Sequence, residues 1–249
     1  MESHAQGYPF TEASAFERLF QDVKLLVEFG QLLTLASDLA DSVQNRGVIA
    51  PAKRFTDFRQ AFLGKFLGQI GKPASSDGSN DVANLRRPAK TFVDPKTNEL
   101  YVADGYGNHR VIVFDADTGA YKRHWGAYGK TPTDEKLPAY KPGDAPQQFA
   151  NPVHCVKISK DGLVYICDRT NDRIQVFKKD GTFVKEFLVA KDTLQQGSVW
   201  DLDFWPDTQQ SFLMNADGAN NEVRTLVREN GEVVGAFGRN GRNAGEFHW

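Results

Sequence analysis

The chain has 249 residues, of which 40% are hydrophobic and 25% are charged, and its formal net charge at pH 7 is −2. This composition is ordinary for a soluble globular protein with one or two domains. A charge so close to zero argues against a nucleic acid or an anionic membrane as the main partner. No hydrophobic run is long enough to span a bilayer.

The N-terminal part differs from the rest of the chain. The opening MESHAQGYPF has no basic region followed by a hydrophobic stretch, so no secretory signal is visible. Between residues 14 and 44 hydrophobic residues recur at steps of three and four, which predicts a helix. Ser14 and Glu17 fit a capping box at its start. We assign residues 1–60 to a helical and irregular segment outside the repeats described next.

From residue 61 to residue 249 the pattern changes to short segments rich in Val, Ile, Phe and Tyr. Glycine-containing turns such as Lys160-Asp161-Gly162 separate them, as in β-hairpins. Three units of similar pattern follow one another, each with four expected strands, at residues 87–129, 151–189 and 198–238. Four-stranded units at this spacing are typical of β-propeller blades. We therefore predict an all-β fold, a β-propeller with about three whole blades and parts of others.

The first two units share a loop between their second and third strands. ELYVADGYGNHRVIVF and LVYICDRTNDRIQVF each contain an Asp, then an Asn, then an Arg between two hydrophobic runs. We expect Arg110 and Arg173 to hold these loops through charge-assisted hydrogen bonds to Asp104 and Asp168. The first loop is longer by one residue, and the added room holds Tyr106.

Two cysteines, Cys155 and Cys167, are too few for a disulfide scaffold or a structural zinc site. If the turn at Lys160-Asp161 closes a simple hairpin, the two cysteines face each other across it, and His154 faces Asp168. Directly opposed residues rarely have good disulfide geometry, so we expect two free, buried thiols. A carboxylate beside His154 would fix the tautomer of its imidazole.

One long insertion separates the first two units. Residues 127–149, AYGKTPTDEKLPAYKPGDAPQQF, are rich in proline and charge. Loops of this length within compact domains are usually functional or mobile. Two interpretations stay open here: the insertion shapes the mouth of the propeller channel, or it is a simple surface excursion.

The Asp…Asn…Arg loops resemble NHL repeats over roughly residues 62–249. Within that group, VADGYGNHRVIVF, QQFANPVH and YICDRTNDRIQVF are similar to peptidyl-α-hydroxyglycine α-amidating lyase. The resemblance implies a six-bladed propeller with a catalytic zinc held by three histidines and a structural calcium in the channel. It also implies cleavage of a peptidyl hydroxyglycine to a peptide amide and glyoxylate, and an extracellular or periplasmic location.

Carried over residue by residue, the resemblance places Tyr106 on the catalytic Tyr of the family, His154 on one zinc-binding His and Arg169 on an active-site Arg. The other two zinc histidines would come from an earlier and a later blade. No matching His occurs in residues 1–85, and the chain stops at Trp249, where the next blade should begin. We therefore expect an incomplete site, and two such chains associating head to tail is one way to complete a ring.

A tyrosine acts as a general base only where a cation or metal favours its phenolate, and Arg169 is placed to supply that charge or to bind a carboxylate. The resemblance implies, on these residues, a carbon–nitrogen lyase whose small-molecule or peptide ligand enters at the channel mouth. The alternative is a non-catalytic NHL propeller that binds a peptide, a protein or a carbohydrate. RNA is not an expected ligand, because no basic face with interleaved aromatic residues emerges.

Overall fold

A computed structural model describes residues 68–248. The helix expected at 14–44, the segment 1–60 and its boundary at residue 61 lie outside these residues, so they stay predictions. In the part of the chain that is described, no helix has the length and hydrophobicity needed to cross a membrane.

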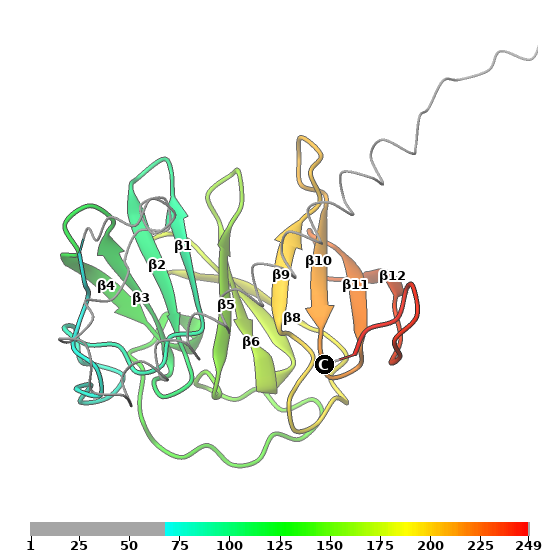
Figure 1. Ribbon diagram of the computed structural model, residues 1–249, viewed down its shortest axis with the longest axis horizontal. Coiled ribbons are helices and arrows are strands. Elements are labelled where there is room, and N and C mark those ends of the chain that lie inside the picture. The colour runs from blue at the N-terminus through cyan, green and yellow to red at the C-terminus, as the bar shows by residue number, and fades with distance from the viewer. Residues whose placement is uncertain (1–67, 249) are drawn as a thin grey trace, which may run out of the picture. The chain divides into compact units, whose positions relative to one another are not determined.

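Three four-stranded antiparallel sheets make up the described fold, and each follows the chain order strand by strand (Figure 1). The first strand of each sheet lies beside the first strand of the next, so β1, β5 and β9 are neighbours. This is the arrangement of propeller blades, and it confirms the predicted all-β blade fold. The strands are β1 (Lys90–Asp94), β2 (Glu99–Asp104), β3 (Arg110–Asp115), β4 (Tyr121–Trp125), β5 (Val153–Ile158), β6 (Val164–Asp168), β7 (Arg173–Phe177), β8 (Phe183–Leu188), β9 (Asp201–Phe204), β10 (Phe212–Asp217), β11 (Glu222–Val227) and β12 (Val233–Phe237).

Alternation along the strands gives each blade two hydrophobic faces. In β6, Ile166 packs toward the first blade, while Tyr165 and Cys167 pack toward the third. The middle blade is thus buried on both faces between its neighbours. In the first blade, Leu100 and Phe114 face the other way, where Ile70 of the preceding segment packs on them.

The same hydrogen-bonded triplet occurs in all three blades. The last residue of the second strand is a buried Asp whose Oδ2 accepts from an Asn Nδ2 and from an Arg Nε. The donor–acceptor distances are 2.7 and 2.9 Å in the first blade, 2.9 and 2.7 Å in the second, and 2.8 and 3.0 Å in the third. The predicted Arg110–Asp104 and Arg173–Asp168 pairs are therefore confirmed, and the third triplet is Asp217, Asn220 and Arg224.

In the first two blades the triplet also binds the chain that enters the blade. The Oδ1 atoms of Asp104 and Asp168 accept backbone N–H groups of Arg86 and Ala150, which precede the first strands. Arg110 also donates to three carbonyl groups of the entering chain, those of Ser79, Asp81 and Asn84. The buried charge pair thus fixes the β2–β3 or β6–β7 loop and the incoming segment together.

The expectation of two free thiols was wrong, because Cys155 and Cys167 form a disulfide. Their predicted register was right: the two residues pair directly across β5 and β6. Narrow antiparallel pairs bring Cα atoms to about 4.5 Å, and the 4.8 Å between these Cα atoms lies within the range that disulfides occupy. Two directly opposed cysteines are therefore close enough to form a disulfide at this position.

The expected pairing of His154 with Asp168 was also wrong. Asp168 pairs with Val153, and the register then shifts so that His154 is the extra residue of a β-bulge. Bulges re-aim side chains near functional sites. The carboxylate of Asp168 instead accepts hydrogen bonds from Arg173, Asn171 and the backbone of Ala150.

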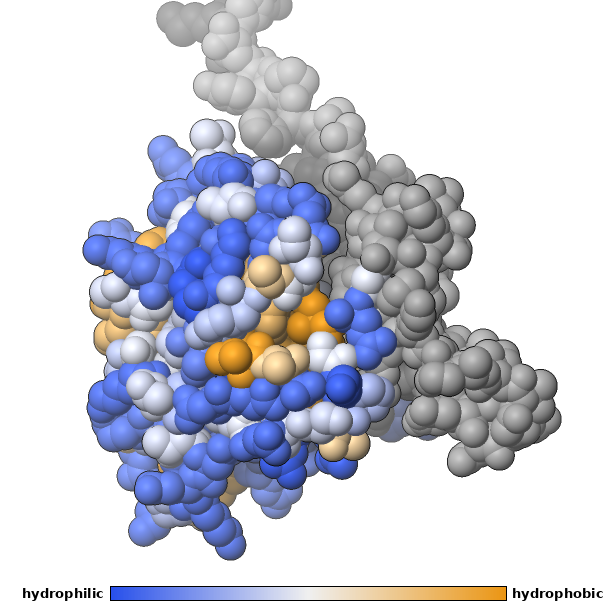
Figure 2. Space-filling view, turned by 90° about the vertical axis from the view of Figure 1, so that its left-hand side faces the viewer, coloured by the Kyte–Doolittle hydropathy of each residue, from blue (hydrophilic) through white to orange (hydrophobic). Residues whose placement is uncertain are grey.

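Figure 2 shows the side of the molecule that the first blade occupies in Figure 1, where a small hydrophobic patch lies within a mostly hydrophilic surface. At the other end of the row of blades, β12 exposes hydrophobic side chains, with Val234 53% and Phe237 49% accessible. Association with a second copy to close a ring stays a prediction.

The connection from β8 to β9 is docked on the β6–β7 loop through Asp172. The backbone carbonyl of Asp172 accepts from Val189 N–H, and its Oδ1 accepts from Ser198 N–H at 2.7 Å. Asp172 is fully buried and its Oδ2 has no hydrogen-bond partner. Burial raises the pKa of Asp172 to about 7, with a smaller contribution from Asp217 and Asp168, although the Ser198 hydrogen bonds act to lower it.

We expect Asp168→Ala to lower the free energy of unfolding by about 3 kcal/mol, because it removes the buried counter-ion of Arg173 and leaves only the longer ion pair with Glu186, at 3.5 Å. The matched control is Asp203→Ala, which removes an ion pair with Lys157 in which the Asp203 side chain is 51% exposed. That change should cost less than about 1 kcal/mol. Urea unfolding measures both, and equal losses would contradict the structural role of the triplet.

The substitution Asp172→Asn tests whether the buried carboxyl of Asp172 makes the stability of the protein depend on pH. Because its pKa is raised from 3.8 to about 7, the folded wild type holds the proton more tightly than the unfolded chain. The contribution of this carboxyl to the free energy of unfolding should therefore fall as pH rises from about 4 to about 7. Asn keeps the acceptor for Ser198 and tolerates the φ of 51° found here.

The Asp172→Asn variant should be as stable as the wild type near pH 4 and more stable at pH 8, as measured by urea unfolding at both values. Unchanged pH dependence between the two proteins would show that Asp172 does not titrate in this window.

Candidate functional site

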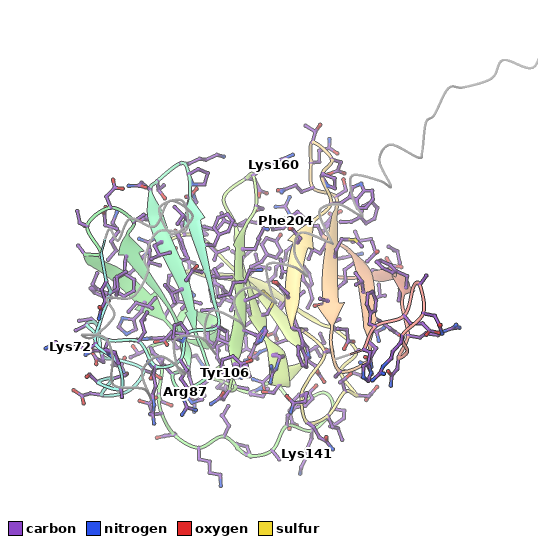
Figure 3. All side chains as sticks on the ribbon, viewed as in Figure 1. Lys72, Arg87, Tyr106, Lys141, Lys160 and Phe204 are labelled. Atoms are coloured by element: carbon purple, nitrogen blue, oxygen red, sulfur yellow. A yellow bond between two sulfur atoms is a disulfide. The ribbon has the colours of Figure 1, made fainter. Side chains whose placement is uncertain are left out.

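The three residues predicted from sequence lie at one end of the blades. Tyr106 is in the β2–β3 loop, His154 is at the start of β5, and Arg169 begins η2 (Arg169–Asn171), a 3₁₀ turn after β6. Antiparallel order places these loops at the same end. In Figure 3 Tyr106 and Lys141 lie toward the lower end of the view, whereas Lys160, in the β5–β6 turn, lies at the upper end.

Two glycines place Tyr106 between the first and second blades. A Cβ on Gly105 would lie 2.1 Å from the backbone of Val153, and one on Gly107 would lie 2.4 Å from the side chain of Arg86. Only glycine permits both approaches. The Tyr106 side chain is 39% exposed, and its backbone N–H donates to the carbonyl of Arg87. The extra loop residue therefore carries the tyrosine to the seam between two blades.

The imidazole of His154 is held from both sides. Its Nδ1 lies 2.5 Å from the carbonyl oxygen of Trp200, and its Nε2 lies 3.0 Å from the Tyr106 hydroxyl. Burial lowers the pKa of His154, and the charges of Arg169 and Lys90 act in the same direction, against the Trp200 carbonyl and Asp201. The neutral ring must carry its hydrogen on Nδ1, because a carbonyl only accepts. Nε2 therefore accepts a hydrogen bond from the Tyr106 hydroxyl.

Arg169 approaches the same hydroxyl from the β6–β7 loop. Its Nη1 lies 3.2 Å from Tyr106 Oη, and its Nη2 donates to Gln196 Oε1 at 2.9 Å. The side chain is largely buried, with 7% of its surface accessible, and its Nε has no hydrogen-bond partner. A permanent positive charge beside Tyr106 Oη stabilises negative charge on that oxygen.

Trp200 and Gln196, both from the β8–β9 connection, were missed by the sequence reasoning. One signal pointed to Trp200: aligning VHCVKI with VWDLDF and AKTFVD puts His154, Trp200 and Lys90 at the same place in their blades. Lys90 is the first residue of β1, His154 is the second residue of β5, and Trp200 directly precedes β9. No comparable signal marked Gln196.

Among residues 68–248, only His154 fits the zinc site that the resemblance implies. Metal-binding histidines commonly donate their second ring N–H to a carbonyl, as Nδ1 does here to Trp200. The equivalent positions of the neighbouring blades hold Lys90 and Trp200, which are not the histidines that such a site needs. A group of His, Cys and acidic side chains near enough to share an ion occurs among residues 68–248 at Cys155, Cys167 and Asp201, but its two sulfurs are joined in the disulfide and it does not include His154. The described residues therefore do not make a three-histidine site.

The insertion between the first two blades lies at the same end as the site. After η1 (Ala127–Gly129) it runs as an irregular segment along the lower edge of the blades in Figure 1. Its Tyr140 hydroxyl donates to the carbonyl of Lys191 in the β8–β9 connection. This location supports the first of the two interpretations, in which the insertion shapes the mouth near the site.

Comparison with known protein families and sequences finds similarity in the part of the chain that holds these loops. The family model for the NHL repeat matches residues 85–114, which contain the whole Tyr106 loop. Peptidyl-glycine alpha-amidating monooxygenase B of Xenopus laevis is 36% identical over 121 residues, which are 48% of this chain and 12% of that protein. NHL repeat-containing protein 3 of Mus musculus is 29% identical over 160 residues, which are 63% of this chain and 37% of that protein.

Among solved structures, hydrazine synthase of Kuenenia stuttgartiensis has a TM-score of 0.43 at 15% identity, covering 68% of this chain and 40% of that one. The matched parts thus span well under half of each of these relatives. The chain thus carries a match to the NHL repeat at residues 85–114 within a fold of propeller blades, and about half of its length resembles the peptidylglycine alpha-amidating monooxygenases.

Proposed function

We propose that this chain contributes the tyrosine, arginine and one histidine of a lyase site of the α-amidating type. The observation that carries the proposal is the convergence on Tyr106 Oη, which lies 3.0 Å from His154 Nε2 and 3.2 Å from Arg169 Nη1. These groups come from two blades, and each matches a residue that the resemblance assigned to the reaction.

The reaction would cleave an N-acyl α-hydroxyglycine. The hydroxyl group loses its proton, its oxygen becomes the aldehyde oxygen of glyoxylate, and the carbon–nitrogen bond breaks. The electron pair of that bond goes to nitrogen, which takes up a proton and leaves as the amide. One proton is removed and one is added, so neither an oxidant nor a reductant is needed.

The described residues suit the proton transfers. Tyr106 passes its proton to the lone pair of His154 Nε2, and its phenolate then accepts the proton of the substrate hydroxyl. The Arg169 guanidinium stabilises the phenolate while it exists. Because burial and the nearby Arg169 and Lys90 charges lower the pKa of His154, its imidazolium gives the transferred proton up readily to the leaving nitrogen. No step here uses a metal, because the described residues do not complete the predicted zinc site; zinc and the channel calcium both stay predictions.

Loss of the Tyr106 hydroxyl should abolish most of this activity. We expect Tyr106→Phe to lower kcat for glyoxylate release from α-hydroxyhippuric acid by about 10²–10⁴-fold, the usual contribution of a general acid or base. The fold should persist, because the Tyr106 ring is partly exposed and Phe keeps it. A glyoxylate assay measures the rate, and urea unfolding checks stability.

Tyr121→Phe is the matched control, since Tyr121 is a similarly exposed tyrosine of the same blade whose hydroxyl bonds His124. It should keep the wild-type rate. A wild-type protein that binds α-hydroxyhippurate but releases no glyoxylate would overturn the lyase proposal. The binding-module alternative would then stand, and it is supported by the fact that, among the described residues, only His154 fits the predicted zinc site.

A further inference from the structure

We propose that Trp200 is a positioning residue that fixes both Arg169 and His154 against Tyr106. The catalytic consequence rests on the lyase function proposed above, whereas the placement of Arg169 is testable without it. Trp200 belongs to the third blade, so the site is built from three blades and not from the two that carry Tyr106, His154 and Arg169.

The indole of Trp200 holds the guanidinium of Arg169. The guanidinium carbon lies 4.7 Å from the centre of the Trp200 ring, closer than the 5.7 Å to the Tyr106 ring. A cation over an indole face is attracted by the ring quadrupole, and indole is the best of the aromatic faces for this. Gln196 binds Nη2 of the same guanidinium. With its face and one nitrogen held, Arg169 directs Nη1 at Tyr106 Oη.

Trp200 is itself held in place. Its Nε1 donates to the carbonyl of Gly197 at 2.8 Å, and its backbone N–H donates to the carbonyl of Ala216. A Cβ on Gly218 would lie 2.5 Å from the indole, and one on Gly197 would lie 1.9 Å from the carbonyl oxygen of Arg169. Both glycines thus allow close packing: Gly218 against the ring of Trp200, and Gly197 against the loop that bears Arg169.

A second atom of Trp200 acts on His154. The Trp200 carbonyl accepts from Nδ1, which leaves the Nε2 lone pair directed at Tyr106. The two rings also lie near each other, with centroids 5.9 Å apart. A single residue therefore orients the cation and the imidazole that meet at the same hydroxyl, one through its side chain and the other through its backbone.

The test removes the aromatic face. Trp200→Met fills much of the space without a π face, Trp200→Leu is a second non-aromatic variant, and Trp200→Phe is the conservative rescue. The matched control is Trp205→Leu, which changes an exposed tryptophan of the same blade. With α-hydroxyhippurate, the Met variant should lose about tenfold in kcat with KM changed less than about threefold, because the guanidinium loses the closer of its two aromatic partners. Phe should restore most of kcat.

A second readout needs no turnover. Phenylglyoxal reacts with accessible guanidinium groups, and mass spectrometry locates the modified arginine. Arg169 should react slowly in the wild type and in Trp205→Leu, several-fold faster in the Met and Leu variants, and near the wild-type rate in the Phe variant. Urea unfolding selects the variants that are folded, and either non-aromatic variant suffices.

Modification of Arg169 at the wild-type rate in a folded non-aromatic variant would overturn the positioning role, whatever the lyase assay shows. Faster modification with unchanged kcat would overturn its catalytic consequence. If the wild type releases no glyoxylate, the proposed function fails, and the modification rates alone decide whether Trp200 holds Arg169.

Discussion

The other features depend on a buried carboxylate that ends the second strand in each of the three described blades. Asp104, Asp168 and Asp217 are at most 1% exposed, and an uncompensated charge there would be costly. In each blade one oxygen of the carboxylate accepts from Asn and Arg donors. In the first two blades the other oxygen holds the entering chain. In these two blades the loop must therefore return its Arg to the position directly opposite the Asp, whatever number of residues lies between them.

That constraint explains why a change of loop length becomes a functional difference. With the Asp and the Arg fixed, the extra residue of the first loop cannot shift the strands and must bulge outward. Glycines on both sides let the loop pass close to Val153 and Arg86, so the added side chain, Tyr106, projects at the seam between blades. In the second blade the shorter loop makes a 3₁₀ turn instead, which begins with Arg169. The same Asp–Arg pair thus holds a loop that presents Tyr106 in the first blade and Arg169 in the second, and the two side chains meet.

Much of this could be predicted from the sequence, because local patterns and repetition determine it. The short segments rich in Val, Ile, Phe and Tyr, the Gly turns and the repeated Asp…Asn…Arg loop predicted three blades and the roles of Arg110 and Arg173. The register at Cys155 and Cys167 followed from the hairpin turn alone. The predicted pairing of His154 with Asp168 was wrong because no residue type in the sequence marks the β-bulge that separates them. The prediction of free thiols was wrong for a different reason: directly opposed residues rarely form disulfides, but Cys155 and Cys167 do.

Trp200 and Gln196 could not be recognised in the same way, because their role depends on which blades are neighbours. A repeat shows that Lys90, His154 and Trp200 occupy equivalent positions, but equivalence alone does not say what each position faces. In the folded chain this position lies at the end of the blades where the loops meet, so its residue type decides the local chemistry. Histidine there offers a lone pair, tryptophan a π face, and lysine a cation, which pairs with Asp201. A propeller can therefore change a site of this kind by single substitutions at one repeated position, while the buried Asp–Arg pairs keep the loops in place. A zinc ion would need histidine at more than one of these positions, whereas tyrosine-based proton transfer needs only one histidine and a cation fixed beside the hydroxyl.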